Sequence, residues 1–502
     1  MDTSMRTLLV SFLLFGCHAC ADVLTGQYDN SRTNATTTET ILTTAKVSGA
    51  FGKLCSYSVD GLVYGQVLYM SGSPNRIFVA TDNDTVYAFN ADGCGSAIWS
   101  QHLDTPKTTT DTNFSAAKVG CTSTPVIDSS AGVIYLVCVN STDVWKLFAL
   151  NISDGSTFHA AVTISGTAQG LTFDSTSHQA RTALLLSGGK VDFGFASYND
   201  GGTWQGWAFA YNSTTLAQTA VFVTVNTSGG RGGIWQAGGG MAADGSGNVY
   251  CTVGNGSFDG TNNFGECILK LNSSLVVQDY LVNSGWATLN TNDTDQGSGR
   301  PILVGTRVMS GGKNGVWWIT DQSNMGHTQV AASPSSQVQD WAGQIELFDA
   351  SAFANNGLYT IDNSHVNPAL PAGIQRNTYN GTTFTTTPSA TSYVYPTYMS
   401  GVAYSSNGAS NGILWVNSCQ VYNLDVTQVG ALRAFDGTTL SLLYDSTAKA
   451  GDAVGNCAKY VSPTVANGKV YLSTFSNTVV VFGPMGGGQL SSKSVLAGGA
   501  IH

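Results

Sequence analysis

The best-grouped acidic residues of the chain lie in the stretch NTNDTDQGSGR, where Asp293 and Asp295 stand shortly before Arg300. Two carboxylates at this spacing resemble part of a calcium-binding loop, because calcium takes oxygen ligands. The loop glycine and the closing glutamate of such a site are missing, and residues 292–294 form an acceptor sequence for N-glycosylation. Asp293 and Asp295 are therefore the candidate calcium ligands, and a solvated, glycosylated loop is the alternative.

Basic residues are scarce, yet Arg181 and Arg300 fall at equivalent positions of a sequence pattern that repeats along the chain. Two arginines on one partly desolvated surface would attract a carboxylate or a phosphate. Lys459 and Trp235 lie near the same position in their own copies and would add a positive charge and a stacking surface. These four residues are the candidate cofactor-binding residues. Alternatively, the arginines bind loop carbonyls and tie neighbouring repeats together.

Other chemistries find no support in the sequence. The histidines are scattered, so hydrolase chemistry has no support from the sequence. The glycine-rich stretches GKNG and GGRGG lack the order of a phosphate-binding loop and fit turns instead. The formal net charge of −10 leaves no basic face for nucleic acid.

Eight cysteines follow the N-terminal Cys17 and Cys20, and in an oxidising compartment an even number favours disulfides over metal ligation. They are Cys55, Cys94, Cys121, Cys138, Cys251, Cys267, Cys419 and Cys457. We expect Cys251 and Cys267 to pair because they flank a polar turn between two predicted strands. The sequence neighbours Cys121 and Cys138 form the second expected pair.

The elements that must position these residues are short repeated strands. The pattern VYAFNADGCGSAIW, an apolar strand, a polar turn and a second strand, begins at residue 86 and recurs from residues 147, 207, 267 and 432. A further recurring strand begins at residues 76, 132, 190, 248, 307, 357, 412 and 469. Eight copies about 56 residues apart match four-stranded blades with long loops. The sequence predicts an all-β fold, an eight-bladed β-propeller of four-stranded antiparallel blades. Seven blades is the alternative, because the sixth copy is the weakest.

Aligning the innermost strand of each copy predicts which side chains face the central channel. The aligned ring positions are Gln66, Thr124, Arg181, Gly240, Arg300, Ser351, Ser400 and Ser462. A shift of one residue would turn each side chain to the other face.

The first copy resembles the docking repeat Ala-x-Asp…Gly…Trp of quinoprotein-type propellers, through Ala88, Asn90, Gly95 and Trp99. Over nearly the whole chain, segments such as YDNSRTNATTTETILT and GGIWQAGGGMAADGSGNVY resemble secreted pyrroloquinoline-quinone-repeat proteins. The resemblance implies that Trp99 packs between adjacent blades. It also makes pyrroloquinoline quinone and calcium possible cofactors, although only three glutamates are present, none in a ligand pattern.

Cys94 is inserted in the turn of this first copy and is absent from the sister copies. We expect its partner to be Cys55.

The N-terminal residues suggest export. Arg6, the apolar run LLVSFLLFG and the small residues ACA have the order of a signal peptide, which predicts cleavage after Ala21. We therefore expect a signal peptide over residues 1–21, one propeller domain over 22–485 and a flexible Gly/Ser-rich tail over 486–502. No later stretch is long enough to span a bilayer. Eleven Asn-x-Ser/Thr sequences, Asn34 and Asn113 among them, would make the secreted protein a glycoprotein in a eukaryotic host.

Two functions fit these features. The first is a secreted, disulfide-stabilised propeller that binds an extracellular small molecule, glycan or protein without catalysis, in agreement with the missing cofactor ligands. The second is a dehydrogenase that depends on pyrroloquinoline quinone and oxidises an extracellular sugar or alcohol. In that case Arg181, Arg300 and Lys459 would hold the cofactor, Trp235 would stack on it, and Asp293 or Asp295 would bind calcium or act as a base.

Overall fold

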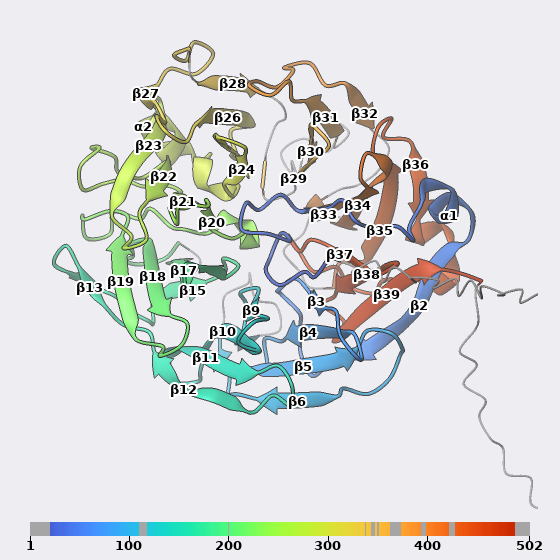
Figure 1. Ribbon diagram of the computed structural model, residues 1–502. Helices are drawn as coiled ribbons and strands as arrows, with labels where there is room; N and C mark the ends of the chain where they lie inside the picture. Colours follow the sequence, from blue (N-terminus) through green and yellow to red (C-terminus); the bar gives the residue numbers. More distant parts are fainter. Residues whose placement is uncertain are drawn as a thin grey trace, which may run out of the picture.

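The computed structural model describes residues 21–486 apart from positions 110–117, 199, 337, 343–346, 349–350, 362–372, 393–397 and 421–426. Within these residues, eight small sheets are arranged around a central axis, as Figure 1 shows. The predicted eight-bladed β-propeller is confirmed, including the weak sixth blade. The expected signal peptide (but for residue 21), the glycosylation site Asn113 and the tail beyond residue 486 lie outside the described residues.

The first four blades follow one another from the innermost to the outermost strand. Blade 1 contains β3 (Leu68–Met70), β4 (Arg76–Ala80), β5 (Thr85–Asn90) and β6 (Trp99–His102). Blade 2 contains β9 (Val126–Asp128), β10 (Val133–Val139), β11 (Trp145–Asn151) and β12 (Thr157–Thr163). Blade 3 contains β15 (His178–Ala180) and β16 (Leu185–Ser187), which both pair with β17 (Lys190–Ser197), then β18 (Trp207–Asn212) and β19 (Gln218–Val223). Blade 4 contains β20 (Ala242–Ala243), β21 (Val249–Thr252), β22 (Cys267–Leu271), β23 (Val277–Asn283) and a fifth, parallel strand, β27 (His327–Gln329).

The remaining four blades complete the ring. Blade 5 contains β24 (Ile302–Val304), β25 (Arg307–Gly311), β26 (Val316–Asp321) and β28 (Gln339–Ala342). Blade 6 contains β29 (Ser351–Ala354), β30 (Gly357–Ile361), β31 (Ile374–Thr378) and β32 (Ala390–Ser392). Blade 7 contains β33 (Tyr398–Asn407), β34 (Ser410–Cys419), β35 (Gly430–Asp436), β36 (Leu442–Asp445) and the parallel β1 (Ala35–Thr36). Blade 8 contains β37 (Thr464–Ala466), β38 (Lys469–Ser473), β39 (Thr478–Pro484) and β2 (Phe51–Ser58).

Short elements fill the connections. They are the strand pairs β7 (Lys107–Thr108) with β8 (Lys118–Val119) and β13 (Thr167–Ala168) with β14 (Leu171–Thr172), the helices α1 (Thr44–Gly49) and α2 (Trp286–Asn292), and the 3-10 turns Gln236–Gly238, Gln296–Ser298, Ser446–Ala448 and Ala450–Asp452. Among the described residues, no helix has the length and apolar character that crossing a bilayer requires.

The strands form because each blade is packed on both faces by its neighbours. All seven residues of β10, VIYLVCV, are buried, and so are most of those in β18. The outermost strand β12 is mostly exposed. A continuous run of β-branched and aromatic residues is typical of a strand buried on both faces. Trp99 also fits its predicted role, because its indole Nε1 donates to the carbonyl of Ile152 in the next blade, at 3.1 Å.

The ring is closed by a strand from each end of the chain. The N-terminal β2 pairs with the C-terminal β39 over the register Phe51↔Pro484 to Ser58↔Thr478. The disulfide between Cys55 and Cys94 then joins blade 8 to blade 1, as predicted. Blade 8 gains its fourth strand through β2, and its face packs against that of blade 1 in one apolar cluster.

The residues before this closure run through the centre of the ring (Figure 1). We call residues 22–36 the axial segment. It contacts the innermost strand of all eight blades or the residues just before it. Each contact is a hydrogen bond to the backbone of a blade. For blades 1 to 7, in order, the bonds are Tyr69 with Val23, Ile127 N to Leu24 O, Thr25 Oγ1 to Leu184 O, Ala243 N to Asn30 O, Leu303 N to Ser31 O, Phe353 N to Thr33 O and Tyr404 N to Asn34 O. In blade 8, the amide of Val465 donates to the Tyr28 hydroxyl at 2.7 Å.

The axial segment is compact and rigidly held. Its residues Gln27, Tyr28, Arg32 and Asn34 all have positive φ, which bends the chain tightly enough to follow a narrow circle. The fully buried Arg32 binds the carbonyls of Gly26 and Met241, at 2.6 and 2.7 Å. The channel is thus filled by the chain's own N-terminal residues, which the sequence analysis did not foresee. It also follows that Asn34, which is fully buried, is closed to glycosylation.

Two of the three predicted disulfides are correct, Cys55–Cys94 and Cys121–Cys138, and the third is wrong. Cys419 pairs with Cys457, for which no partner was predicted. Cys251 and Cys267 are instead buried free thiols. They do lie on adjacent strands, but the register places Cys251 opposite Leu269. Cys267 is therefore a diagonal neighbour, and diagonal positions are farther apart than a disulfide allows.

Candidate functional site

One polar cavity of about 210 Å³ lies near the axis of the ring, which we call the axial cavity. Its walls come from residues at or before the innermost strands and from residues at the end of the second strands or after them, in blades 1, 3, 4, 5 and 8. They are Tyr64, Gln179, Arg181, Ala196, Ser197, Asp200, Trp204, Gly233, Trp235, Gly254, Asn255, Asp293, Asp295, Lys313, Lys459 and Tyr460. Because the axial segment fills the channel and supplies none of these walls, the cavity is a pocket at one end of the channel.

The axial cavity brings together five of the six candidate site residues named from the sequence. Arg181, Trp235, Lys459, Asp293 and Asp295 all line it. Positions scattered over almost 280 residues thus meet because equivalent turns of different blades converge at the axis.

Arg300 lies apart from this cavity. Its side chain is 1% exposed and donates to the carbonyl oxygens of Arg32 and Ser351, both at 2.9 Å through Nη2. It therefore connects blade 5 to the axial segment and to blade 6, which is the structural role that the sequence left as an alternative.

Arg181 combines both roles. Its Nη1 donates to the carbonyls of Tyr64 and Thr122 at 2.8 and 3.0 Å, and its Nη2 donates to the carbonyl of Lys459 at 3.2 Å. The guanidinium group is thereby fixed in the cavity wall, beside the half-buried Lys459. Two positive charges on one wall favour an anionic group in the ligand.

Lys313 is a site residue that the sequence analysis missed, because GKNG was interpreted only as a turn. Its ammonium group lies 2.8 Å from Asp295 Oδ1 and 2.9 Å from Asp293 Oδ1. Burial alone would lower the pKa of Lys313, but the charges of Asp295 and Asp293 raise it well above the ordinary value. Lys313 therefore stays protonated and bridges the two carboxylates.

Glu266 lies behind this bridge as a neutral acid. Burial, together with the charge of Asp295, raises the pKa of Glu266 to about 9. Its Oε2 accepts a hydrogen bond from the amide of Gln296 at 2.8 Å. Burial also raises the pKa of Asp295, which Lys313 opposes. At neutral pH Glu266 thus keeps its proton.

Two further lining residues carry polar atoms without a protein partner. The indole Nε1 of Trp204 and the Oδ1 of Asn255 are buried and make no hydrogen bond to any described residue. An unpaired buried polar group is costly, so native structures usually pair it with protein, water or ligand. Neither atom has appreciable accessible surface, so a ligand pairs with them only when the Trp204 and Asn255 side chains rotate toward the cavity. Neither residue stands out in the sequence.

The carboxylate pair does not fit calcium. A calcium ion takes six to eight oxygen ligands. The position between Asp293 and Asp295 is already taken by the Lys313 ammonium group, and Asn255 Nδ2 donates to Asp293 Oδ1 at 2.5 Å. For the quinone, Arg181 and Lys459 suit its carboxylates, and Trp235 lies in the wall with Phe348 and Tyr460 packed at its edges. The volume of about 210 Å³ is below the roughly 300–1,000 Å³ of pockets for drug-sized ligands.

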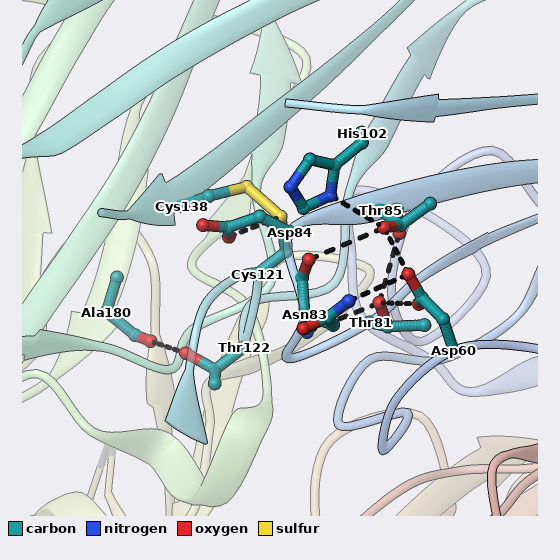
Figure 2. Close-up of a disulfide and its surroundings, with 10 residues drawn as sticks. All are labelled: Asp60, Thr81, Asn83, Asp84, Thr85, His102, Cys121, Thr122, Cys138 and Ala180. Carbon is teal, nitrogen blue, oxygen red and sulfur yellow. Dashed lines mark hydrogen bonds between the residues drawn. A yellow bond between two sulfur atoms is a disulfide. The ribbon is translucent and has the colours of Figure 1, made fainter. Parts of the chain in front are cut away.

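A second cluster contains metal-ligand types, Asp84 with Cys121 and Cys138. Figure 2 shows the carboxyl group of Asp84 beside the disulfide, and Asp84 Oδ1 lies 3.5 Å from Cys121 Sγ. Metal ions bind thiolates, which a disulfide does not offer. The cluster is thus no metal site in the oxidised protein.

The fold and the cavity define an eight-bladed β-propeller with one polar pocket at its axis. Solved structures with the same architecture include the quinohemoprotein alcohol dehydrogenases of Pseudomonas putida HK5 (TM-score 0.62, 13% identity, 94% of this chain and 81% of that chain) and of Comamonas testosteroni (TM-score 0.62, 14% identity, 95% and 83%). A europium-containing methanol dehydrogenase is similar as well (TM-score 0.53, 14% identity, 90% and 81%). At this identity the similarity shows the shared fold alone. No family model and no curated protein matches the sequence.

Proposed function

We propose that the protein is a secreted binding propeller that takes a small hydroxycarboxylate, such as a sugar acid, in the axial cavity without catalysis. The observation that carries this proposal is the pair of unpartnered atoms in the wall, the Trp204 donor and the Asn255 acceptor. A hydroxyl group of the ligand would donate to Asn255 and another oxygen would accept from Trp204. The carboxylate would lie toward Arg181 and Lys459. The three disulfides support secretion into an oxidising compartment.

Calorimetry with a panel of hydroxycarboxylates and their neutral counterparts tests this function. We expect gluconate or glucuronate to bind more tightly than glucose. Trp204→Phe, which removes the N–H donor together with part of the ring, should weaken binding about tenfold, in line with about 1–2 kcal/mol for one hydrogen bond. Trp286→Phe, whose side chain does not line the cavity, is the matched control for the loss of ring volume. Equal affinity for acids and neutral sugars, or no loss in Trp204→Phe, would exclude this mode of binding.

The second candidate is quinone-dependent oxidation of an alcohol or a sugar. It is supported by the fold similarity to dehydrogenases and by the three residues that suit the quinone, Arg181, Lys459 and Trp235. When bound, the quinone supplies the electron acceptor for the oxidation. Arg181 and Lys459 would orient it through its carboxylates, and the ionised member of the Asp293 and Asp295 pair would take up the hydroxyl proton.

Reconstitution separates the two candidates. The purified protein is mixed with pyrroloquinoline quinone, with and without calcium, and passed over a desalting column. Retained quinone absorbance and dye reduction with sugars or alcohols would support the dehydrogenase. Binding of hydroxycarboxylates with no retained quinone would support the non-catalytic binding protein.

A further inference from the structure

A second cavity, of about 280 Å³, lies between blades 6 and 7, and we call it the rim cavity. It is lined by the hairpins that join the first two strands of these blades and by the turn after β35. The axial cavity is lined instead by residues that follow the second strands. Because consecutive strands run in opposite directions, the two cavities open on opposite faces of the ring.

Arg376 on β31 forms one wall of the rim cavity and is held firmly in place. Its Nη1 donates to the hydroxyls of Thr378 and Ser389 at 3.1 and 2.9 Å, and its Nε donates to the Tyr359 hydroxyl at 3.3 Å. Its guanidinium carbon lies 5.9 Å from the centre of the Tyr359 ring. Among the described residues, Nη2 binds no protein acceptor. A fixed guanidinium group therefore presents two donors to the cavity.

Asp436 supplies the opposite charge. Its Oδ1 accepts hydrogen bonds from the amides of Thr438 and Thr439, both at 2.9 Å, which fixes the carboxylate at the turn. Within the part of the chain that the structure describes, no donor binds Oδ2. Asn411, also in the wall, makes no side-chain hydrogen bond to a described residue. The wall thus offers a charged donor, a charged acceptor and an amide that provides both.

Tyr359 and Tyr404 form the wall behind these groups, and they are tightly packed. Tyr359 and Tyr404 stack with ring centres 4.9 Å apart, and Tyr359 donates its hydroxyl hydrogen to the carbonyl of Gly437 at 2.5 Å. A β-carbon at Gly412 would collide with the Tyr404 hydroxyl, and one at Gly357 would lie 2.9 Å from Arg376 Nε. Glycine at these positions lets the tyrosines and Arg376 pack where they do.

We propose that the rim cavity is a binding site for a neutral polyhydroxylated ligand, a monosaccharide unit. Arg376 and Asp436 contribute equal and opposite charges, so the site attracts neither anions nor cations overall. A sugar hydroxyl both donates and accepts, and neighbouring hydroxyls can therefore satisfy Asp436 Oδ2 and Arg376 Nη2 together. This site is independent of the axial cavity and of the function proposed for it.

Saturation-transfer NMR with glucose, galactose, mannose and N-acetylglucosamine tests the proposal on the full-length protein. We expect at least one sugar to bind saturably. Arg376→Gln and Asp436→Asn should each weaken this binding about 10- to 100-fold, which corresponds to the loss of a hydrogen bond to a charged group. Asp436→Asn keeps the oxygen that accepts from the turn amides, so it tests the site without removing that turn.

Arg231→Gln, an exposed arginine that lines neither cavity, is the matched control and should leave sugar binding unchanged. Circular dichroism and the melting temperature establish that each variant is folded. The proposal is overturned if none of the four sugars binds, or if both rim variants bind as the wild type does. It is equally overturned if glycine or alanine, whose two charges would match Arg376 and Asp436, binds there and sugars do not.

Discussion

The guanidinium group of Arg300 donates two hydrogen bonds to the backbone carbonyl of Arg32, from Nε at 3.2 Å and from Nη2 at 2.9 Å. Arg300→Gln would remove both bonds to this buried carbonyl and leave that of Ser351 with the Asn34 Nδ2 donor alone, at 3.1 Å. We expect the free energy of unfolding to fall by about 3 kcal/mol, because a hydrogen bond to a charged group contributes about 1.5–3 kcal/mol. Urea denaturation measures the change, and the exposed Arg231→Gln is the control. A loss of ligand affinity without a loss of stability would show that Arg300 binds the ligand and does not stabilise the fold.

The Tyr28 hydroxyl joins the axial segment to blade 8, because it accepts from Val465 N in β37 and donates to Pro463 O just before that strand. Tyr28→Phe removes the acceptor of Val465 N and leaves Pro463 O with the Gln66 Nε2 donor alone, at 3.4 Å. The expected cost is about 1–3 kcal/mol in the free energy of unfolding. Tyr211→Phe, whose hydroxyl accepts from Gln218 within its own blade, should cost less. Equal losses of stability in the two variants would show that the bond between Tyr28 and blade 8 contributes no more than a local hydroxyl bond.

The thiols of Cys251 and Cys267 should be detectable only after unfolding. Both are buried, and burial raises the pKa of Cys251 to about 12, so neither is a reactive thiolate at neutral pH. Thiol titration of the protein that begins after residue 21 should find two thiols in denaturant and none in the native state. Each single alanine variant should remove one. Detection of no thiol in denaturant would mean that the two cysteines are oxidised together.

Raising the pH should destabilise the fold through Asp84, which lies beside the Cys121–Cys138 disulfide in Figure 2. Burial, with the charges of Asp104 and Asp82, raises the pKa of Asp84 to about 9. Between its ordinary value near 4 and about 9, the unfolded chain loses this proton while the folded protein keeps it. The free energy of unfolding therefore falls as the pH rises, by up to about 1.4 kcal/mol per pH unit.

Asp84→Asn should flatten this slope, measured by denaturation between pH 4 and pH 9. Asp82→Asn is the comparison, because burial raises the pKa of Asp82 only to about 6. Its effect should be confined to the acidic end of the range. An unchanged slope in Asp84→Asn would contradict the assignment.

Removing the Lys313 ammonium group should create a calcium response that the wild type lacks. Lys313→Ala leaves the carboxylates of Asp293 and Asp295 without the cation that bridges them. We expect calcium to raise the melting temperature of this variant and not that of the wild type, because an ion that binds only the folded state stabilises it. Magnesium, which prefers a stricter geometry, is the control. Calcium stabilisation of the wild type would show that Lys313 does not occupy the cation position.

The sequence predicted the features that recur in every blade, and it did not predict the features that occur once in the chain. Eight strand patterns such as RIFVA and KVYLST reveal the blades because each must bury both faces, and the ring alignment located Arg181 correctly at the axis. The axial segment has no repeat and no apolar period, so nothing in its sequence marks it as buried. Lys313 was missed since a lysine in a glycine turn is usually solvated. The pairing of Cys251 depends on register, which sequence spacing does not determine.

The axial segment also sets an order in time. It is made first, yet 437 residues separate Tyr28 from Val465, its partner in blade 8. At roughly 5–20 residues per second, ribosomes need about 20–90 s to make that stretch. Until the last blade arrives, most polar groups of the axial segment must stay bound to water or to a chaperone. We therefore expect the final step of folding to be closure of the ring around the axial segment, which is synthesised before the blades.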